Sequence, residues 1–119
     1  MNGHSDYLVT MEEIHHTQKK DAPSGTAITL AEQIMQEISA KKNWVNNATD
    51  NPDKLPIISK REDPAPGTHC IKYSSVIDDI EIIHTAHSRN GFALGAVLAA
   101  EYIHNKKGIF KMKDVLGIS

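Results

Sequence analysis

The chain has 119 residues, of which 24% are charged and 39% hydrophobic, and its formal net charge is −2. This length suits one domain spanning residues 1–119 with a core of its own. The near-neutral charge does not favour a nucleic-acid or membrane-surface partner, because such partners usually require a basic patch. The longest apolar run, residues 92–100, reaches about half of a membrane span, so no transmembrane helix is expected. The single cysteine, Cys70, excludes an internal disulfide and favours a cytoplasmic location.

The first predicted elements are a strand, a loop and a helix. Tyr7, Val9 and Met11 alternate with other residues over positions 6–14, which favours a strand. A loop then runs to Pro23, and Ser24 or Thr26 is expected to cap the helix that follows. Apolar residues recur at three- and four-residue spacing over positions 27–38, which is typical of an amphipathic helix that packs on a core.

The rest of the chain predicts mostly strands and one further helix. Residues 43–56 are rich in Asn, Asp and Pro and are interpreted as an irregular surface connection. Strands are expected at 57–62, 68–76 and 80–86, the last two joined by a tight turn at Asp78-Asp79. The apolar pattern of 92–104 predicts a helix buried on more than one side. Residues 109–116 are expected to form a short strand followed by a turn.

This order of elements predicts an α+β fold. We expect a single open, mixed β-sheet of about four strands with helices packed on one face. The sheet would then remain available for oligomer formation, because its strands carry apolar residues and one face lacks a cover.

The most informative segment is residues 13–27, which concentrates two imidazoles, two ammonium groups and a Ser-Gly-Thr turn just before a helix. Imidazole and ammonium groups can donate protons near neutral pH. The first N–H groups of a helix lack intrahelical partners and attract anions, and Gly25 would let a ligand approach the backbone closely. Together these features indicate a site for a small, negatively charged substrate.

Other interpretations compete with this one. A helix cap needs no ligand, and any single histidine or lysine is usually a solvated polar residue. A metal site is not expected, because the adjacent His15 and His16 would point to opposite faces of a strand, as would His84 and His87. His69, His84, His87 and His104 are interpreted as scattered strand, surface or interface residues.

The same segment resembles the signature of dihydrodipicolinate reductase, the 4-hydroxy-tetrahydrodipicolinate reductase of lysine biosynthesis. The resemblance rests on residues 13–27, which read Glu-x-His-His-x-x-Lys-x-Asp-Ala-Pro-Ser-Gly-Thr-Ala. Later segments agree with that family, including residues 66–69, 79–86, 89–97 and 108–116. The likeness covers nearly the whole chain and corresponds to the family's C-terminal substrate-binding and tetramerisation domain.

The resemblance implies roles for particular residues. His15 matches the family's proton donor/acceptor and Lys19 its proton donor, so both are expected to be catalytic. Substrate binding is expected from His16, Gly25 and Thr26, with Ser24 in the same carboxylate cradle. Arg89 matches a family arginine near the substrate and would hold a carboxylate.

The resemblance also implies partners and cofactors. The substrate would be a small dicarboxylate, and the full-length enzyme would use NADH or NADPH. The chain has no Gly-x-Gly-x-x-Gly loop, so the family's N-terminal dinucleotide-binding domain is expected to be absent from it. This chain would then bind no cofactor and no metal and would be inactive alone. A homotetramer formed through the β-sheet is expected. The alternative is a non-catalytic anion-binding oligomerisation module.

Overall fold

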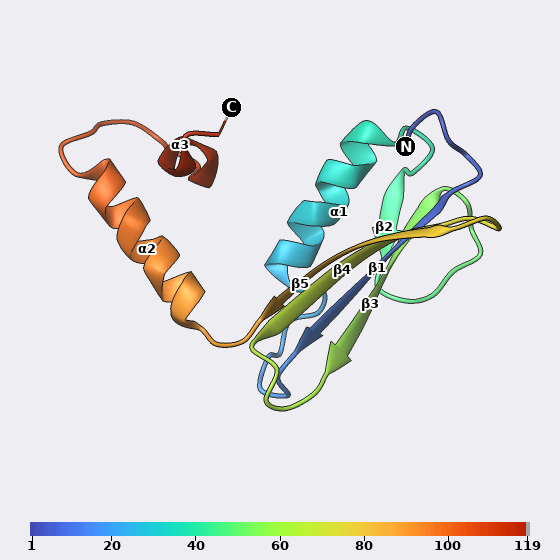
Figure 1. Ribbon diagram of the computed structural model, residues 1–119, viewed down its shortest axis with the longest axis horizontal. Helices are drawn as coiled ribbons and strands as arrows, with labels where there is room; N and C mark the ends of the chain where they lie inside the picture. Colours follow the sequence, from blue (N-terminus) through green and yellow to red (C-terminus); the bar gives the residue numbers. More distant parts are fainter. Residues whose placement is uncertain (119) are drawn as a thin grey trace. The chain divides into compact units, whose positions relative to one another are not determined.

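The computed structural model describes residues 1–118 of the chain. These residues form two compact units, Met1–His87 and a second unit that begins at Ser88 (Figure 1). The first unit contains β1 (Leu8–His15), α1 (Gly25–Glu37), β2 (Asn43–Val45), β3 (Lys54–Arg61), β4 (Gly67–Ser74) and β5 (Asp79–Ala86). The second unit contains α2 (Asn90–Ile103) and α3 (Met112–Leu116). None of the described helices combines the length and apolar character that a membrane crossing requires.

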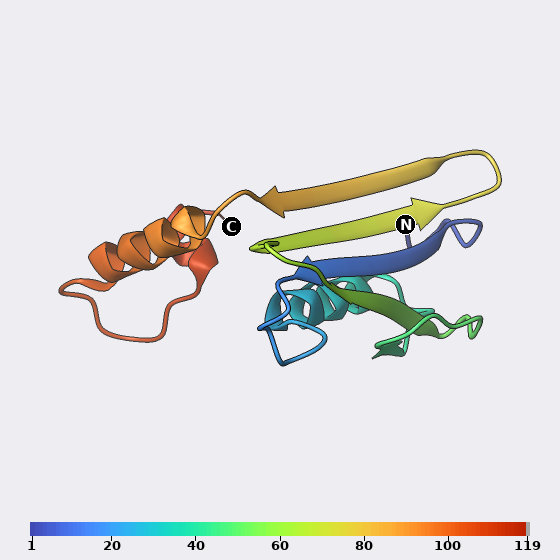
Figure 2. The same cartoon turned by 90° about the horizontal axis from the view of Figure 1, so that it is seen from below.

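The strands of the first unit form one open, mixed sheet in the order β2-β3-β1-β4-β5 (Figure 2). The central strand, β1, is parallel to β3 and antiparallel to β4, whereas β4 and β5 form an antiparallel hairpin. The predicted α+β class with a single open mixed sheet is therefore confirmed, with five strands in place of about four.

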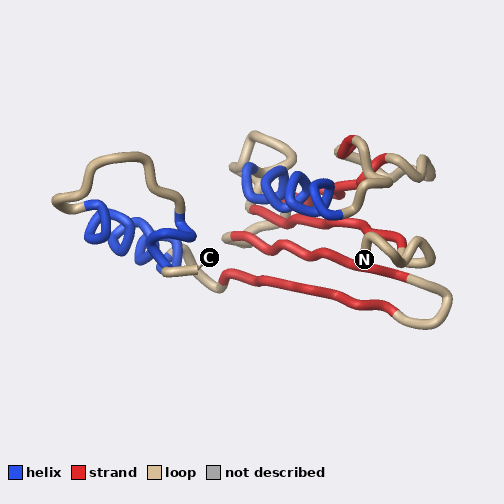
Figure 3. The backbone as a smooth tube through the Cα atoms, turned by 90° about the horizontal axis from the view of Figure 1, so that it is seen from above, coloured by secondary structure: helices blue, strands red, loops and turns tan. Residues whose placement is uncertain are grey.

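Strand β1 supplies the middle of the core because its side chains alternate between the two faces of the sheet. Val9, Met11, Glu13 and His15 are buried, while the intervening residues are more exposed. Helix α1 covers this face at β1 and β3 (Figure 3). The apolar core consists of Val9, Met11, Ala27, Ala31, Ile34, Leu55 and Ile57.

The buried face of β1 changes from apolar to polar toward the end of the strand. Strand pairing extends each β1 residue into a row across the sheet. The row of Met11 contains Ile57, Met11, Ile71 and Ile82, and the next row on this face contains Ser59, Glu13, His69 and His84. Ionisable side chains thus lie beside the carboxyl end of β1, at the margin of the apolar core.

Two segments of the first unit differ from the prediction in their secondary structure or in their boundaries. Residues 43–56 were expected to be irregular, but they contain β2 and the start of β3, which pair in parallel with each other. The Pro- and Asn-rich composition concealed these strands because their formation depends on pairing between segments about ten residues apart. Helix α1 begins at Gly25, and Ser24 caps it as predicted: the Ala27 N–H donates to the Ser24 Oγ at 3.2 Å.

The second unit corrects two predictions. Helix α2 was expected to be buried on more than one side, but none of its residues is buried. Residues 109–116 were expected to form a strand and a turn, whereas they contain helix α3. Its start is stabilised by a hydrogen bond from the Lys111 N–H to the Asp114 carboxylate at 2.7 Å, and its end by Gly117 in the left-handed conformation.

Candidate functional site

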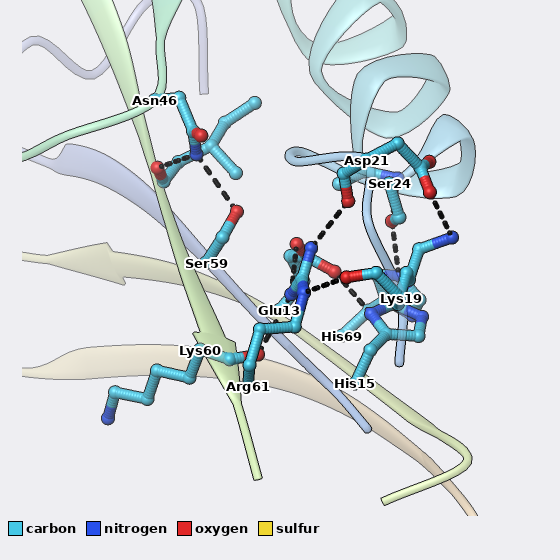
Figure 4. Close-up of polar contacts among 12 residues, drawn as sticks. Glu13, His15, Lys19, Asp21, Ser24, Asn46, Ser59, Lys60, Arg61 and His69 are labelled. Atoms are coloured by element: carbon cyan, nitrogen blue, oxygen red, sulfur yellow. Dashed lines mark hydrogen bonds and ion pairs between the residues drawn. The ribbon is translucent and has the colours of Figure 1, made fainter. Parts of the chain in front are cut away.

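A histidine and a carboxylate lie together on the buried face at the end of β1. Glu13 is fully buried and His15 is 9% exposed. The Nδ1 atom of His15 and the Oε2 atom of Glu13 form an ion-pair contact, and neither atom has another hydrogen-bond partner among the described residues (Figure 4). The imidazole is therefore held by the carboxylate two residues before it on the same face of the strand.

Glu13 has a second, cationic partner at the end of β3. The Nη1 atom of Arg61 donates to the Oε1 atom of Glu13 at 3.0 Å. Burial raises the pKa of Glu13, but hydrogen bonds from Ser59 and Arg61, together with the charge of Arg61, lower it more, and the net pKa is below its ordinary value. Glu13 is thus an ionised carboxylate at neutral pH, and the positive charge of Arg61 compensates its charge inside the protein.

Arg61 also holds the loop between β1 and α1. Its Nη2 atom donates to the Asp21 carbonyl at 2.7 Å, and its Nε atom donates to the Lys19 carbonyl at 3.3 Å. The Lys19 ammonium lies 3.1 Å from the Asp21 carboxylate, and this hydrogen bond is the main reason that the pKa of Asp21 is lowered. The predicted proton donor Lys19 is therefore placed by one guanidinium and one carboxylate.

The start of the same loop is fixed by Asp63. The Thr17 N–H and hydroxyl donate to its two carboxylate oxygens at 2.9 and 2.6 Å. These bonds lower the pKa of Asp63. Arg61 at the end of β3 and Asp63 just after it therefore anchor the two ends of the loop that carries Lys19.

Helix α1 presents free donors at its first turn. Ser24 is 3% exposed and uses its Oγ to cap the Ala27 N–H. The N–H groups of Gly25 and Thr26 in this turn have no intrahelical acceptor. Both residues are exposed, and a Cβ placed on Gly25 would meet no atom within 4 Å. This open space at a helix N-terminus can accommodate an anion.

His69, on β4, connects the helix start to the β1 histidine. Its Nε2 atom lies 3.1 Å from the Ser24 Oγ, and its ring stacks edge-on against that of His15 with centroids 5.2 Å apart. Burial, and next the proximity of His15, lower the pKa of His69. His69 lies on a strand, as one of the interpretations held, but it is not isolated, because strand pairing brings it opposite Glu13.

Glu13, His15 and His69 are also a possible set of metal ligands. Each offers one donor atom, and these atoms lie within 4.8 Å of one another. Their donor atoms already have partners, however: Glu13 contacts Arg61 and His15, and His69 contacts Ser24. We interpret the group as a hydrogen-bonded network, and the expectation of no native metal stays a prediction.

The structure brings most of the predicted site residues together. His15, His16 and Lys19 lie at the end of β1 and in the loop after it, and the loop leads directly to the α1 start, where Ser24, Gly25 and Thr26 lie. Arg89 belongs to the second unit, where it is the N-cap of α2. Its role in holding a carboxylate stays a prediction.

Three residues of this site were given no role from the sequence: Glu13, Arg61 and His69. Glu13 carried a usable signal, because it alternates with Val9, Met11 and His15 and so had to share their buried face. Arg61 and His69 offered no comparable signal. Their place beside Glu13 and His15 depends on the pairing of β1 with β3 and β4.

The fold and this site together define a class: an α+β ligand-binding domain with proton-donating side chains beside an anion-accepting helix start. Comparison with known proteins identifies the family. The family model for dihydrodipicolinate reductase, C-terminus, matches residues 1–116. The chain belongs to this family, which confirms the resemblance found in the sequence.

Individual relatives agree with the family assignment. The chain is 60% identical over 116 residues to the 4-hydroxy-tetrahydrodipicolinate reductase of Christiangramia forsetii, covering 98% of this chain and 48% of that protein. It is 43% identical over 111 residues to the same enzyme of Aquifex aeolicus, covering 89% of this chain and 42% of the relative. The chain thus spans about half the length of the curated relatives it matches.

A solved structure has a similar fold. It is described as dipicolinate-bound dihydrodipicolinate reductase from Paenisporosarcina sp. TG-14, and it aligns with a TM-score of 0.65 and 24% identity. The alignment covers 91% of this chain and 44% of that one. At this identity the comparison supports the fold.

Proposed function

We propose that the chain is the substrate-binding and proton-donating part of a 4-hydroxy-tetrahydrodipicolinate reductase, which forms tetrahydrodipicolinate in lysine and diaminopimelate biosynthesis. The observation that carries the proposal is the site itself. Lys19 and the buried pair His15–Glu13 lie beside the capped start of α1, within a chain that belongs to the reductase family. The family also disfavours the alternative of a non-catalytic anion-binding module.

The proposed substrate is a six-membered ring with two carboxylates. One carboxylate would accept hydrogen bonds from the free N–H groups of Gly25 and Thr26 and from the Thr26 hydroxyl, assisted by the partial positive charge of the helix start. His16 and Lys19 would supply further donors around the ring. This binding mode explains why the space beside Gly25 needs to be empty.

The proposed reaction combines loss of water with reduction. The ring hydroxyl leaves as water together with a hydrogen of the neighbouring ring carbon, and a double bond of the resulting unsaturated ring then gains one hydride and one proton. The chain's part is to orient the dianion and to supply that proton from Lys19 or His15. Asp21 and Arg61 hold Lys19 in place for this step.

The hydride would come from NADH or NADPH when the cofactor is bound to the complete enzyme. This chain's residues do not fit a dinucleotide by themselves: α1 begins within the segment Ser24-Gly25-Thr26, and the sequence lacks a Gly-x-Gly-x-x-Gly loop. We therefore assign this chain no cofactor-binding residue, and we expect it to be inactive alone.

We further propose a cytoplasmic homotetramer formed through the sheet. Strand β5 lies at the edge of the sheet with an unpaired side, and it exposes the apolar residues Ile80, Ile82 and Ile83. Pairing or packing of this surface with further copies would remove it from water. The molar mass of the protein in solution, measured by light scattering, tests this assembly, and a monomeric protein would contradict it.

Calorimetric titration with pyridine-2,6-dicarboxylate, a planar mimic of the substrate, tests the site directly. We expect saturable binding to this chain and weaker binding to the Thr26→Val variant, which loses the hydroxyl but keeps its size. Equal binding by the two proteins would place the carboxylate elsewhere. Reductase activity of the full-length protein that contains the chain, with either nicotinamide cofactor, tests the reaction.

A further inference from the structure

Glu13 is a buried carboxylate to which the proposed reaction assigns no part. It is 0% exposed, and an isolated charge in such a place would be strongly unfavourable. Its Oε1 atom accepts from Arg61 and its Oε2 atom contacts Nδ1 of His15, while Ser59 also donates a hydrogen bond to the carboxylate. The protein therefore keeps an ionised carboxylate buried at the edge of the apolar core, in contact with the Nδ1 atom of His15.

This arrangement determines where the proton of a neutral His15 resides. An ionised carboxylate can only accept hydrogen bonds, so its contact with Nδ1 requires that Nδ1 carry the hydrogen. The other ring nitrogen, Nε2, then holds the lone pair. A Cβ built on Gly67 would lie 3.2 Å from this Nε2 atom, so glycine at position 67 keeps the side of Nε2 free of a side chain.

We propose that Glu13 is a positioning residue that fixes His15 in the Nδ1–H tautomer, so that Nε2 is the atom that takes up and returns a proton during the reaction. The part of this inference that concerns the reaction rests on the proposed function. The part that concerns the tautomer rests only on the contacts of Glu13, His15 and Gly67.

Arg61 links the Glu13 carboxylate to Lys19, the second proposed proton donor. The guanidinium that neutralises Glu13 also donates to the carbonyls of Lys19 and Asp21. A shift of the Glu13 carboxylate would therefore move both the His15 ring and the loop that carries Lys19. One buried ion pair thus sets the geometry of the two groups proposed to exchange protons.

The ¹⁵N chemical shifts of the His15 ring, measured by NMR on this chain at a pH where the imidazole is neutral, test the tautomer. We expect a protonated Nδ1 and an unprotonated Nε2 in the wild type. The Glu13→Gln variant offers an amide N–H to Nδ1 and is expected to shift His15 toward the Nε2–H tautomer. An Nε2–H tautomer in the wild type would overturn the proposal, whether or not the variant folds.

The matched control is Glu12→Gln. Glu12 precedes Glu13 on β1, is partly exposed and pairs with Lys60 on the side of the sheet away from His15. This variant removes the same charge and is expected to leave the His15 tautomer unchanged. A tautomer that stays Nδ1–H in Glu13→Gln as well would show that the carboxylate does not select it.

Activity of the full-length protein gives a second readout. We expect Glu13→Gln to lower kcat by about 10²- to 10⁴-fold with a much smaller change in KM, and Glu12→Gln to leave both nearly unchanged. Equal kcat values for the two variants would overturn the positioning role in catalysis. A wild-type protein without reductase activity would overturn the proposed function, whereas the His15 tautomer decides the structural assignment in either case.

Discussion

The Oγ atom of Ser24 lies 3.1 Å from the Nε2 atom of His69, which joins the cap of helix α1 to strand β4. The same hydroxyl accepts the Ala27 N–H, so the helix start and the imidazole share one oxygen. His69 in turn packs edge-on against His15. The protonation state of His69 is therefore coupled to both the helix cap and the neighbouring imidazole.

This coupling predicts that His69 makes the protein less stable in mild acid. Burial and the nearby His15 lower the pKa of His69 below its ordinary value of about 6.5. Below that pH the unfolded chain binds a proton that the folded chain does not, so the free energy of unfolding falls as the pH decreases. Between about pH 7.5 and pH 5.5, the free energy of unfolding measured with denaturant should fall more for the wild type than for His69→Gln.

The exposed His4 provides the control for that experiment. A His4→Gln variant should lose as much stability in mild acid as the wild type does. If His69→Gln also matched the wild type over this pH range, His69 would not be the group responsible.

A larger side chain at position 25 should leave the fold intact but weaken ligand binding. A Cβ at this position meets no atom within 4 Å, so Gly25→Val should leave the melting temperature nearly unchanged. Its side chain would fill the space in front of the first helical N–H groups. We expect at least about a tenfold weaker affinity for pyridine-2,6-dicarboxylate, which corresponds to ~1.4 kcal/mol.

Gly3→Val is the matched control, because a Cβ at Gly3 also meets no atom within 4 Å and Gly3 lies outside the site. Calorimetry should give this variant the affinity of the wild type. An unchanged affinity in Gly25→Val would indicate that the ligand does not approach the start of α1.

Lys19 should be required for turnover rather than for folding. Lys19→Ala in the full-length enzyme should lower kcat by about 10²- to 10⁴-fold, since it removes a proton donor. Lys19→Arg keeps the positive charge but holds its proton too tightly to donate it, so binding should recover while turnover stays low. Steady-state kinetics separate the two effects, with the exposed Lys20→Ala as control. Turnover restored by arginine would exclude proton donation by Lys19.

The core beneath the site should be sensitive to truncation at Leu55. This β3 side chain is 0% exposed and belongs to the cluster between the sheet and α1. Leu55→Ala should reduce the free energy of unfolding by about 2–5 kcal/mol. Leu8→Ala on β1 removes the same atoms from a residue that is 62% exposed and should change it by less than ~0.5 kcal/mol. Equal losses in urea unfolding would contradict the assignment of Leu55 to the core.

Local patterns predicted the parts of the fold that local interactions form. The alternation in β1, the stripe of α1, the Ser24 cap and the turn between β4 and β5 were all expected from the sequence. Each depends on residues close together in the chain. The family motif likewise indicated His15, Lys19 and the start of α1, because these positions form one continuous segment.

Strands and contacts that depend on pairing between segments far apart in the sequence were not predicted. Strand β2 has only three residues and exists because it pairs with β3. Arg61 reaches Glu13 across 48 positions and His69 reaches Ser24 across 45, and no local signal marks either partner. Helix α2 was misjudged for a related reason, since an apolar surface in the sequence does not reveal which molecule, if any, covers it.

The central position of β1 has a consequence for how the nascent chain acquires its structure. Of the five strands described, β1 is synthesised first, yet both of its neighbours, β3 and β4, come later, and its pairing extends to Ser74. Such non-local pairing forms late, because the intervening chain must first be made and closed. Glu13 and His15 are therefore translated well before Arg61 and His69, and the strand that carries them cannot complete its pairing until nearly two-thirds of these residues have been translated.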